Sequence, residues 1–426
     1  MKVQQFFKLG HTPSLFAALL YFDVSFMVWV LLGPLAPFIS EQLNLNAAQK
    51  GLMLAIPLLG GAVFRVILGV LSDHLGCRKT GLLGLTLTLI PLLIGWRFAH
   101  TLPHFYLVGL LLGIAGASFA VALPLAGSWY PPEHQGLAMG IAGAGNSGTL
   151  IATLFAPRLA QAFGWNNAFG FAMLPILLVL VLFAIMAKDS PSRPKAPAWK
   201  DYAAVLKQSD VGWFCLVYSF TFGGFVGLAS FLTVFFHDQF HLTKVRAGDF
   251  TTIVVVAGSF LRPVGGFLAD KIGGYRLLLI LLLGVGLCLG GVGWSASLPL
   301  VVVLLFMGMG MLGMGNGAVF QLVPQRFPDR MGVITGLVGA AGGIGGFFLP
   351  SFLGAMKFKT GTYSTGLLLC AGAYIVVQLV LLHLGRYWDN TWQEDSVRRA
   401  GVFCYRRLLR GLAGGGADLA EEKEAA

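Results

Sequence analysis

The chain has 426 residues, of which 56% are hydrophobic and only 11% are charged. So few charges cannot cover a water-exposed surface, and the composition excludes a soluble enzyme or a disordered protein. The net charge of +11 comes from basic residues in short gaps between apolar runs, which argues against a nucleic-acid partner. The five cysteines are far apart and form no C-x-x-C pair. We therefore expect no metal site, no disulfide framework and no cofactor.

Twelve apolar runs follow one another along the chain, and each is long enough for a membrane-spanning helix. They lie at about 14–38, 48–72, 80–98, 104–130, 134–162, 168–187, 211–236, 248–270, 275–296, 298–323, 331–355 and 363–386. The longest polar gap between them, 188–210, is rich in proline, lysine and serine, as is typical of a linker. The pattern predicts an all-α polytopic membrane protein with a six-helix bundle in 1–187, a linker in 188–210, a second bundle in 211–386 and a tail in 387–426.

The distribution of lysine and arginine predicts the orientation. If both termini lie on one side, that side holds 20 of these residues, the opposite side holds 7, and two lie inside apolar runs. Positive charge is enriched in cytoplasmic loops, so both termini and the tail are predicted to be cytoplasmic, in a multi-pass protein of the cell (inner) membrane. We expect a monomer in the lipid bilayer.

The two halves of the chain repeat each other. Within GGAVFRVILGVLSDHLG (60–76) and GSFLRPVGGFLADKIGG (258–274), Arg65, Gly69, Asp73 and Gly76 align with Arg262, Gly266, Asp270 and Gly273 at an offset of 197. PEHQGLAMGIAG (132–143) aligns with PDRMGVITGLVG (328–339) at an offset of 196. Two matches at nearly one offset predict pseudo-symmetric halves, a pattern typical of secondary transporters with a site between the halves. The repeated G-x-x-x-D-x-x-G pieces, with Asp73 and Asp270, resemble the loop signature of the major facilitator superfamily. In that superfamily, the aspartate stabilises the outward-open state.

Arg65 and Arg262 align between the two halves, and each lies eight residues before its motif aspartate. Eight helical residues span about 12 Å, so both guanidiniums are expected inside the bilayer. A charged residue at that depth indicates a functional site. A structural ion pair is the alternative, but no pair of carboxylates is expected at that depth. Two cations without acids favour an anion, and guanidinium groups bind planar oxyanions with two hydrogen bonds.

The predicted helices 5 and 11 are dense in glycine. Close helix packing is one explanation, and close approach of the backbone to a small ligand is another. With the paired arginines, these stretches resemble the nitrate/nitrite porter family of the major facilitator superfamily. The resemblance implies substrate binding by Arg65, Arg262, Phe119, Tyr218, Phe222 and Asn146, with Asn316 and Gln321 as further polar candidates. It implies signature or gating roles for Gly140, Gly143, Gly145, Gly148, Gly339, Gly342, Gly343, Gly345, Gly346, Asp73 and Asp270.

The resemblance implies secondary active transport of nitrate, and also of nitrite, by alternating access rather than an enzymatic reaction. Asp23 is the only acid deep in an apolar run apart from the two motif aspartates. It is either a proton site or a structural residue bonded to a neighbouring helix. The proton site would favour proton-coupled nitrate uptake. The alternatives are nitrate/nitrite exchange, which needs no protonatable group, and transport of another small planar anion such as formate.

Overall fold

The computed structural model describes residues 6–7, 9–191, 207–327 and 331–402, which are almost entirely helical. Twelve helices or helix pairs in this part of the chain are long and apolar enough to cross a membrane, as predicted. The spans of the N-terminal half are α2 (Thr12–Trp29) with α3 (Leu32–Gln42), α4 (Ala47–Leu75), α5 (Cys77–Arg97), α6 (Leu102–Gly116) with α7 (Phe119–Gly127), α8 (Pro132–Gly143) with η1 (Ala144–Ser147) and α9 (Gly148–Phe163), and α10 (Trp165–Met186).

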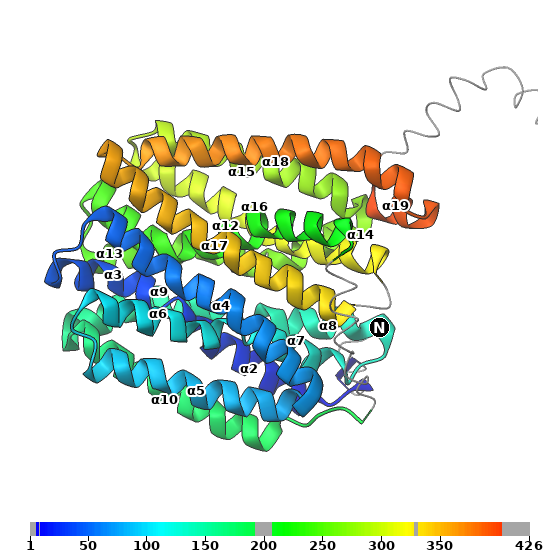
Figure 1. Cartoon of the computed structure of the whole chain (residues 1–426), viewed down its shortest axis with the longest axis horizontal. Helices are drawn as coiled ribbons and strands as arrows, with labels where there is room; N and C mark the ends of the chain where they lie inside the picture. The colour runs from blue at the N-terminus through cyan, green and yellow to red at the C-terminus, as the bar shows by residue number, and fades with distance from the viewer. Residues whose placement is uncertain (1–5, 8, 192–206, 328–330, 403–426) are drawn as a thin grey trace, which may run out of the picture.

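The C-terminal half repeats this arrangement and ends in a short extra helix. Its spans are α12 (Ser209–Phe240), α13 (Lys244–Phe260) with α14 (Arg262–Ile272), α15 (Gly274–Trp294), α16 (Leu298–Arg326), α17 (Met331–Thr360) and α18 (Ser364–Thr391), and α19 (Glu394–Ala400) follows. In Figure 1, the blue-to-green helices of the first half lie below the green-to-orange helices of the second. Helices α4 and α17 lie side by side where the halves meet.

Two pairs of glycines mark the repeat in the backbone itself. Gly76 and Gly273 end α4 and α14 with φ of 97° and 90°. Gly164 and Gly361 have φ of 88° and 76°, at the turns before the sixth and the twelfth span. Both pairs are 197 residues apart (273 − 76 and 361 − 164). Glycine reaches positive φ without the steric penalty of a side chain, which explains why it stands at all four sharp turns. The backbone therefore supports the pseudo-symmetry predicted from the sequence.

Glycines also let the helices approach each other closely in both halves. A methyl group on Gly113 of α6 would lie 2.1 Å from the carbonyl carbon of Gly60 on α4. In the second half, a methyl group on Gly313 of α16 would lie 2.2 Å from the carbonyl oxygen of Gly258 on α13. Such backbone-to-backbone contact is typical of packing between membrane helices.

Replacing Gly113 with alanine is expected to destabilise the protein by at least about 2 kcal/mol, because neither backbone can yield to the added methyl group. The measurement is the thermal unfolding midpoint of the detergent-purified protein. Gly372→Ala on α18 is the matched control, since a methyl group there would meet no atom within 4 Å. Equal unfolding midpoints for the two variants would show that α4 and α6 can move apart to admit the methyl group without loss of stability.

The end of the last span differs from the prediction. Helix α18 continues to Thr391, beyond the predicted end at 386, and its last turns bury Leu384 and Trp388. Helix α19 then turns back, so that Gly401 packs against Gly273 at the end of α14. These apolar contacts explain why the helix outlasts the apolar run. Residues 192–206 of the predicted linker and residues 403–426 of the tail lie outside the described residues, and the predicted domain boundaries remain predictions.

Three ion pairs join the two halves at the end of the molecule away from the chain termini, where α3 and α13 lie in Figure 1. They are Lys50–Asp238 at 2.9 Å, Arg158–Asp249 at 2.7 Å, and Lys244–Glu41. Glycine contacts between the halves lie at the same end: a methyl group on Gly51 of α4 would be 2.4 Å from the Pro350 carbonyl oxygen on α17. The halves are therefore closed together at this end.

Towards the termini, glycines of the fifth and eleventh spans have free space. Methyl groups placed on Gly140 of α8 or Gly336 of α17 would meet no atom of the described residues within 4 Å. The contrast between the two ends indicates that the halves diverge towards the termini.

Candidate substrate-binding site

Arg65 lies in the middle of α4, and its side chain is only 1% exposed. Its Nε donates a hydrogen bond to the carbonyl oxygen of Gly116 at 3.0 Å, and its Nη1 donates to that of Gly339. Gly116 belongs to the first half and Gly339 to the second, so the guanidinium bridges the halves. Its remaining nitrogen, Nη2, is buried without a hydrogen-bond partner among the described residues. An unpaired donor on a buried cation is costly, which indicates that a ligand completes this group.

Three aromatic rings surround the Arg65 guanidinium. Its central carbon lies 5.2 Å from the ring centroid of Trp29, 5.3 Å from that of Phe119 and 4.8 Å from that of Phe222. These rings come from α2, α7 and α12, so both halves contribute to the cage. Cation–π contact stabilises a buried guanidinium without consuming its N–H donors, which remain available to an anion.

Arg262 is the first residue of α14, at the junction where the eighth span breaks. Its guanidinium carbon lies 5.5 Å from the Phe119 ring centroid and 5.8 Å from that of Phe320. The Phe119 ring is thus shared by both guanidiniums. The Nη1 of Arg262 is also buried without a partner. Among the described residues, neither arginine forms an ion pair, so the alternative of a structural pair with a carboxylate finds no partner there.

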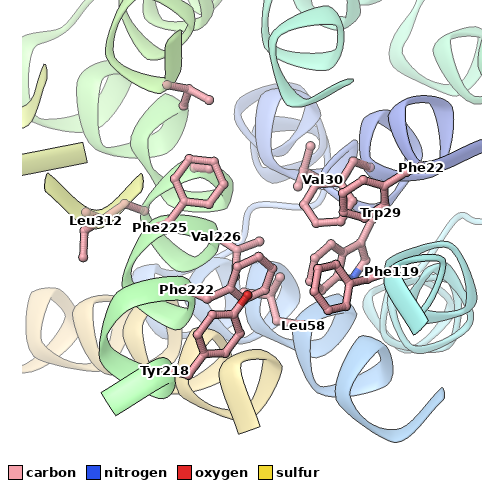
Figure 2. Close-up of a cluster of buried hydrophobic side chains, with 14 of the residues drawn as sticks. Phe22, Trp29, Val30, Leu58, Phe119, Tyr218, Phe222, Phe225, Val226 and Leu312 are labelled. Carbon is pink, nitrogen blue, oxygen red and sulfur yellow. The ribbon is translucent and has the colours of Figure 1, made fainter. Parts of the chain in front are cut away.

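Tyr218 and Phe222 form one wall of the site. Their rings stack one turn apart on α12, with centroids 5.2 Å apart and planes 5° from parallel. Phe320 meets Tyr218 edge-on at 5.1 Å and lies 6.0 Å from Phe119. Figure 2 shows Tyr218 and Phe222 on one side of the cluster and Trp29 and Phe119 on the other. The structure therefore brings together the two arginines and the three aromatic residues predicted from the sequence.

Asn146 and Asn316 are fully buried, and within the part of the chain that the structure describes neither carboxamide has a hydrogen-bond partner at its oxygen or its nitrogen. Asn146 lies in the short η1 turn between α8 and α9, and Asn316 lies in α16. Leaving such groups unpaired costs about 1–3 kcal/mol each. Both are therefore ready to bind a polar ligand or water inside the protein.

The structure places Gln321 elsewhere. Its Oε1 accepts a hydrogen bond from the backbone amide of Gly274 at 3.2 Å, and its Nε2 donates to the carbonyl oxygen of Arg399 at 3.4 Å. The side chain thus ties the start of α15 to α19, and its contact with the substrate stays a prediction that these two bonds do not support. Trp29 and Phe320 also line the candidate site, although nothing in their local sequence marks them.

Residues 17–350 match the sequence model of the Major Facilitator Superfamily. The chain is 33% identical over 379 residues to the "Nitrite extrusion protein" of Bacillus subtilis, a match that covers 88% of this chain and 94% of the relative. It is 32% identical over 381 residues to the "Probable nitrate/nitrite transporter NarK2" of Mycobacterium tuberculosis, covering 86% and 95%. The chain belongs to the nitrate/nitrite porter family of the Major Facilitator Superfamily.

Solved structures agree with this fold. The xylose transporter XylE from E. coli, in a partially occluded inward open conformation, matches with a TM-score of 0.70 at 15% identity, covering 87% of this chain and 98% of that chain. The human organic anion transporter MFSD10 matches with a TM-score of 0.67 at 17% identity, covering 87% and 99%. The predicted fold class, two pseudo-symmetric six-helix bundles, is confirmed. Membership of a transporter family also confirms the prediction of a transporter rather than an enzyme.

The signature glycines of this porter have two kinds of surroundings. The first group packs against neighbouring helices so closely that a larger side chain would not fit. Gly145 and Gly148 contact α2, Gly343 contacts Ala62 of α4, and Gly342, Gly345 and Gly346 contact α12. Gly339 faces Phe119 and Arg65, whereas Gly140 has no neighbour within 4 Å and Gly143 has only one, at 3.9 Å. Packing therefore accounts for the glycines of the first group, and Gly339 lies directly at the site.

The two motif aspartates lie at the termini end, at matching places in the halves. Asp73 is half-buried near the end of α4, and Asp270 is exposed near the end of α14. Asp270 takes part in none of the four ion pairs found among the described residues. The resemblance links these aspartates to an outward-open state. One turn before Asp270, a methyl group on Gly266 would meet no atom of the described residues within 4 Å, so α14 is not tightly packed there.

Asp23 lies on α2, and its Oδ1 accepts a hydrogen bond from the Ser147 hydroxyl at 2.6 Å. The structure thus shows the contact with a neighbouring helix that was one of the two predicted explanations. Among the described residues, no group of three or more His, Cys, Asp or Glu side chains could hold a metal ion.

Proposed function

We propose that this porter is a secondary active transporter of nitrate and nitrite. The observation that carries the proposal is the pair of guanidiniums between the halves, which share the Phe119 ring and each keep a buried nitrogen without a partner. Two cations with no ion-paired acid require an anion for charge balance. The family relatives named for nitrite extrusion and for nitrate/nitrite transport support this choice of anion.

The aromatic walls favour a flat anion over a tetrahedral one. Between the stacked face of Tyr218 and Phe222 and the Phe119 ring, a planar anion can lie with its oxygens in the plane of the guanidiniums. A tetrahedral phosphate would push an oxygen into one of the rings. Formate is also planar, so transport of formate or a similar small anion is the second candidate, and competition with nitrate distinguishes the two.

We propose that the protein resides in the cell (inner) membrane with both termini in the cytoplasm. The excess of basic residues on the termini side supports this orientation. The end closed by three ion pairs then faces outwards, and the structure represents an inward-facing state. Alternating access follows if an anion between the two guanidiniums reduces their repulsion, so that the halves close at the cytoplasmic end and separate at the outer end.

For uptake, we propose coupling to protons, with exchange of nitrate for nitrite as the alternative mode. Moving one negative charge into a negative-inside cell costs about 2.3 kcal/mol per 100 mV. That work requires either a co-transported cation or an anion leaving the cell. Asp23, the only acidic residue deep in the first span, supports the first mode. Two guanidiniums that can bind the anion without a titratable acid support the second.

Proteoliposomes holding the purified protein test both the substrate and the coupling. Nitrate uptake is measured with an inward proton gradient and no internal anion, and then with internal nitrite and no gradient. We expect gradient-driven uptake, inhibited by nitrite and unaffected by phosphate. Uptake that requires internal nitrite would establish exchange instead. Uptake of formate that nitrate does not inhibit would overturn the substrate assignment.

A further inference from the structure

The fifth span is broken where it passes Asp23. Helix α8 ends at Gly143, the 3-10 turn η1 covers Ala144–Ser147, and α9 begins at Gly148. At this turn, the Ser147 hydroxyl donates a hydrogen bond to Asp23 Oδ1 at 2.6 Å. The backbone amide of Gly148 donates within the turn, to the carbonyl oxygens of Gly145 and Asn146. Asp23 therefore ties the turn to α2 through the Ser147 side chain.

The backbones make the same junction tight. A methyl group on Gly148 would lie 1.8 Å from the Asp23 carbonyl oxygen, and one on Gly145 would lie 2.8 Å from the Asp23 amide nitrogen. Both glycines of the turn thus rest on the backbone around Asp23. The carboxylate and the two close contacts together determine where the η1 turn lies relative to α2.

Asn146 lies inside this turn, directly before Ser147. Its carboxamide is completely buried and has no partner at either atom. Without an anchor, such a side chain would gain by turning towards any available donor or acceptor. An anchored turn holds this carboxamide in place although it has no hydrogen bonds of its own, as preorganised binding sites require.

We propose that Asp23 is a positioning residue for substrate: through Ser147 and the η1 turn, it holds the Asn146 carboxamide in the orientation that binds the transported anion. This inference rests on the proposed function, because it takes the anion as the ligand of Asn146. It applies to proton coupling and to exchange alike, because the role of Asp23 here is to accept hydrogen bonds, which a neutral amide oxygen can also do.

The experiment is a double-mutant cycle on the KM for nitrate in proteoliposomes. Asp23→Ala is expected to raise KM about tenfold, the effect of losing one hydrogen bond of ordinary strength, with little change in maximal rate. Asn146→Ala is expected to raise KM by at least as much. In the double variant, the Asp23 change is expected to add nothing, because its effect passes through Asn146. Asp23→Asn, which keeps an acceptor oxygen, is expected to stay within about threefold of the wild type.

Two further variants keep the test decisive. Ser147→Ala removes only the donor and is expected to shift KM in the same direction, so it replaces Asp23→Ala if that protein does not fold. Thr88→Ala is the matched control: its buried hydroxyl donates to the Gly84 carbonyl oxygen within α5 and has no bond to the turn. Its KM is expected to equal that of the wild type.

Three results would overturn the inference. The first is an additive effect of Asp23→Ala and Asn146→Ala on KM. The second is an unchanged KM in both Asp23→Ala and Ser147→Ala. The third is a KM in Asp23→Asn as high as that in Asp23→Ala, because the asparagine keeps an acceptor oxygen. Absence of nitrate and nitrite transport in the wild type would overturn the proposed function itself, a result distinct from these three.

Discussion

Arg65→Lys is expected to reduce the initial rate of nitrate uptake by about 100-fold or more. Arg65 donates to one backbone carbonyl oxygen in each half and still keeps a free nitrogen, Nη2, for the anion. Lysine has one nitrogen in place of three and cannot make these contacts in the same plane. Losing two charge-assisted hydrogen bonds at about 1.5–3 kcal/mol each is sufficient for this effect. Uptake into proteoliposomes measures it.

A binding measurement separates recognition from folding in this experiment. Nitrate is expected to raise the unfolding midpoint of the wild type but not that of Arg65→Lys, because only a bound ligand stabilises the folded state. Arg97→Lys is the matched control, since Arg97 is exposed and contacts only the face of Trp96 among the aromatic rings. If Arg65→Lys binds and transports nitrate like the wild type, the two-arginine site is wrong and the substrate has to be reconsidered.

The fold could be predicted because the bilayer acts on features that are local in the sequence. Runs of about 20 apolar residues, the side that carries lysine and arginine, and the repeated glycines each follow from one physical requirement. The end of α18 could not be predicted this way. It continues to Thr391 because Trp388 stacks on Phe214 and Trp392, a contact between distant parts of the chain.

The charged part of the site was predictable because an arginine within the bilayer is rare and costly. Its aromatic part was less so, since phenylalanine and tryptophan are ordinary in apolar runs. Phe119, Tyr218 and Phe222 came from family resemblance, whereas nothing in their local sequence marks Trp29 or Phe320. The carbonyl acceptors of Arg65 on Gly116 and Gly339 leave no signal at all, because every residue carries that group.

The position of Gln321 away from Asn316 has a geometric cause. Asn316 and Gln321 are five residues apart on one helix, which turns them about 140° from each other, so they cannot share a face. Phe320, four residues from Asn316, is on the same face and does reach the site. Helical periodicity would therefore have excluded Gln321 and suggested Phe320.

The ion pairs at the end proposed to face outwards also lie beyond local sequence signals, because each joins residues about 90 to 200 positions apart. In the sequence, Lys50, Arg158 and Lys244 are among the seven basic residues counted on the side opposite the termini. Lys50 and Asp238 are the most enclosed pair, with side chains 18% and 17% exposed, and the Tyr363 hydroxyl donates a further hydrogen bond to Asp238 at 3.1 Å. This pair is therefore expected to contribute most to holding the outer end closed.

Reversing one charge of this pair, by Lys50→Asp or Asp238→Lys, is expected to favour the outward-open state about tenfold or more. The change replaces an attraction with a repulsion between halves, and a difference of about 1.4 kcal/mol between the two states is already tenfold. The double variant Lys50→Asp with Asp238→Lys restores an attractive pair and is the matched control. Nitrate uptake is expected to fall in each single variant and to recover in the double variant.

The state itself can be measured with a cysteine at Ala55, which is fully buried on the stripe of α4 that also carries Gly51 and Leu58 and faces α17. A membrane-impermeant maleimide added outside reaches this position only when α4 and α17 separate at the outer end. The labelling rate of Ala55→Cys is expected to rise about tenfold in each single charge reversal and to return towards the starting rate in the double variant. Equal labelling rates in all four backgrounds would show that glycine packing alone closes the outer end. The ion pairs would then have no role in alternating access, because a contact acts as a gate only if it changes the free-energy difference between the inward-open and outward-open states.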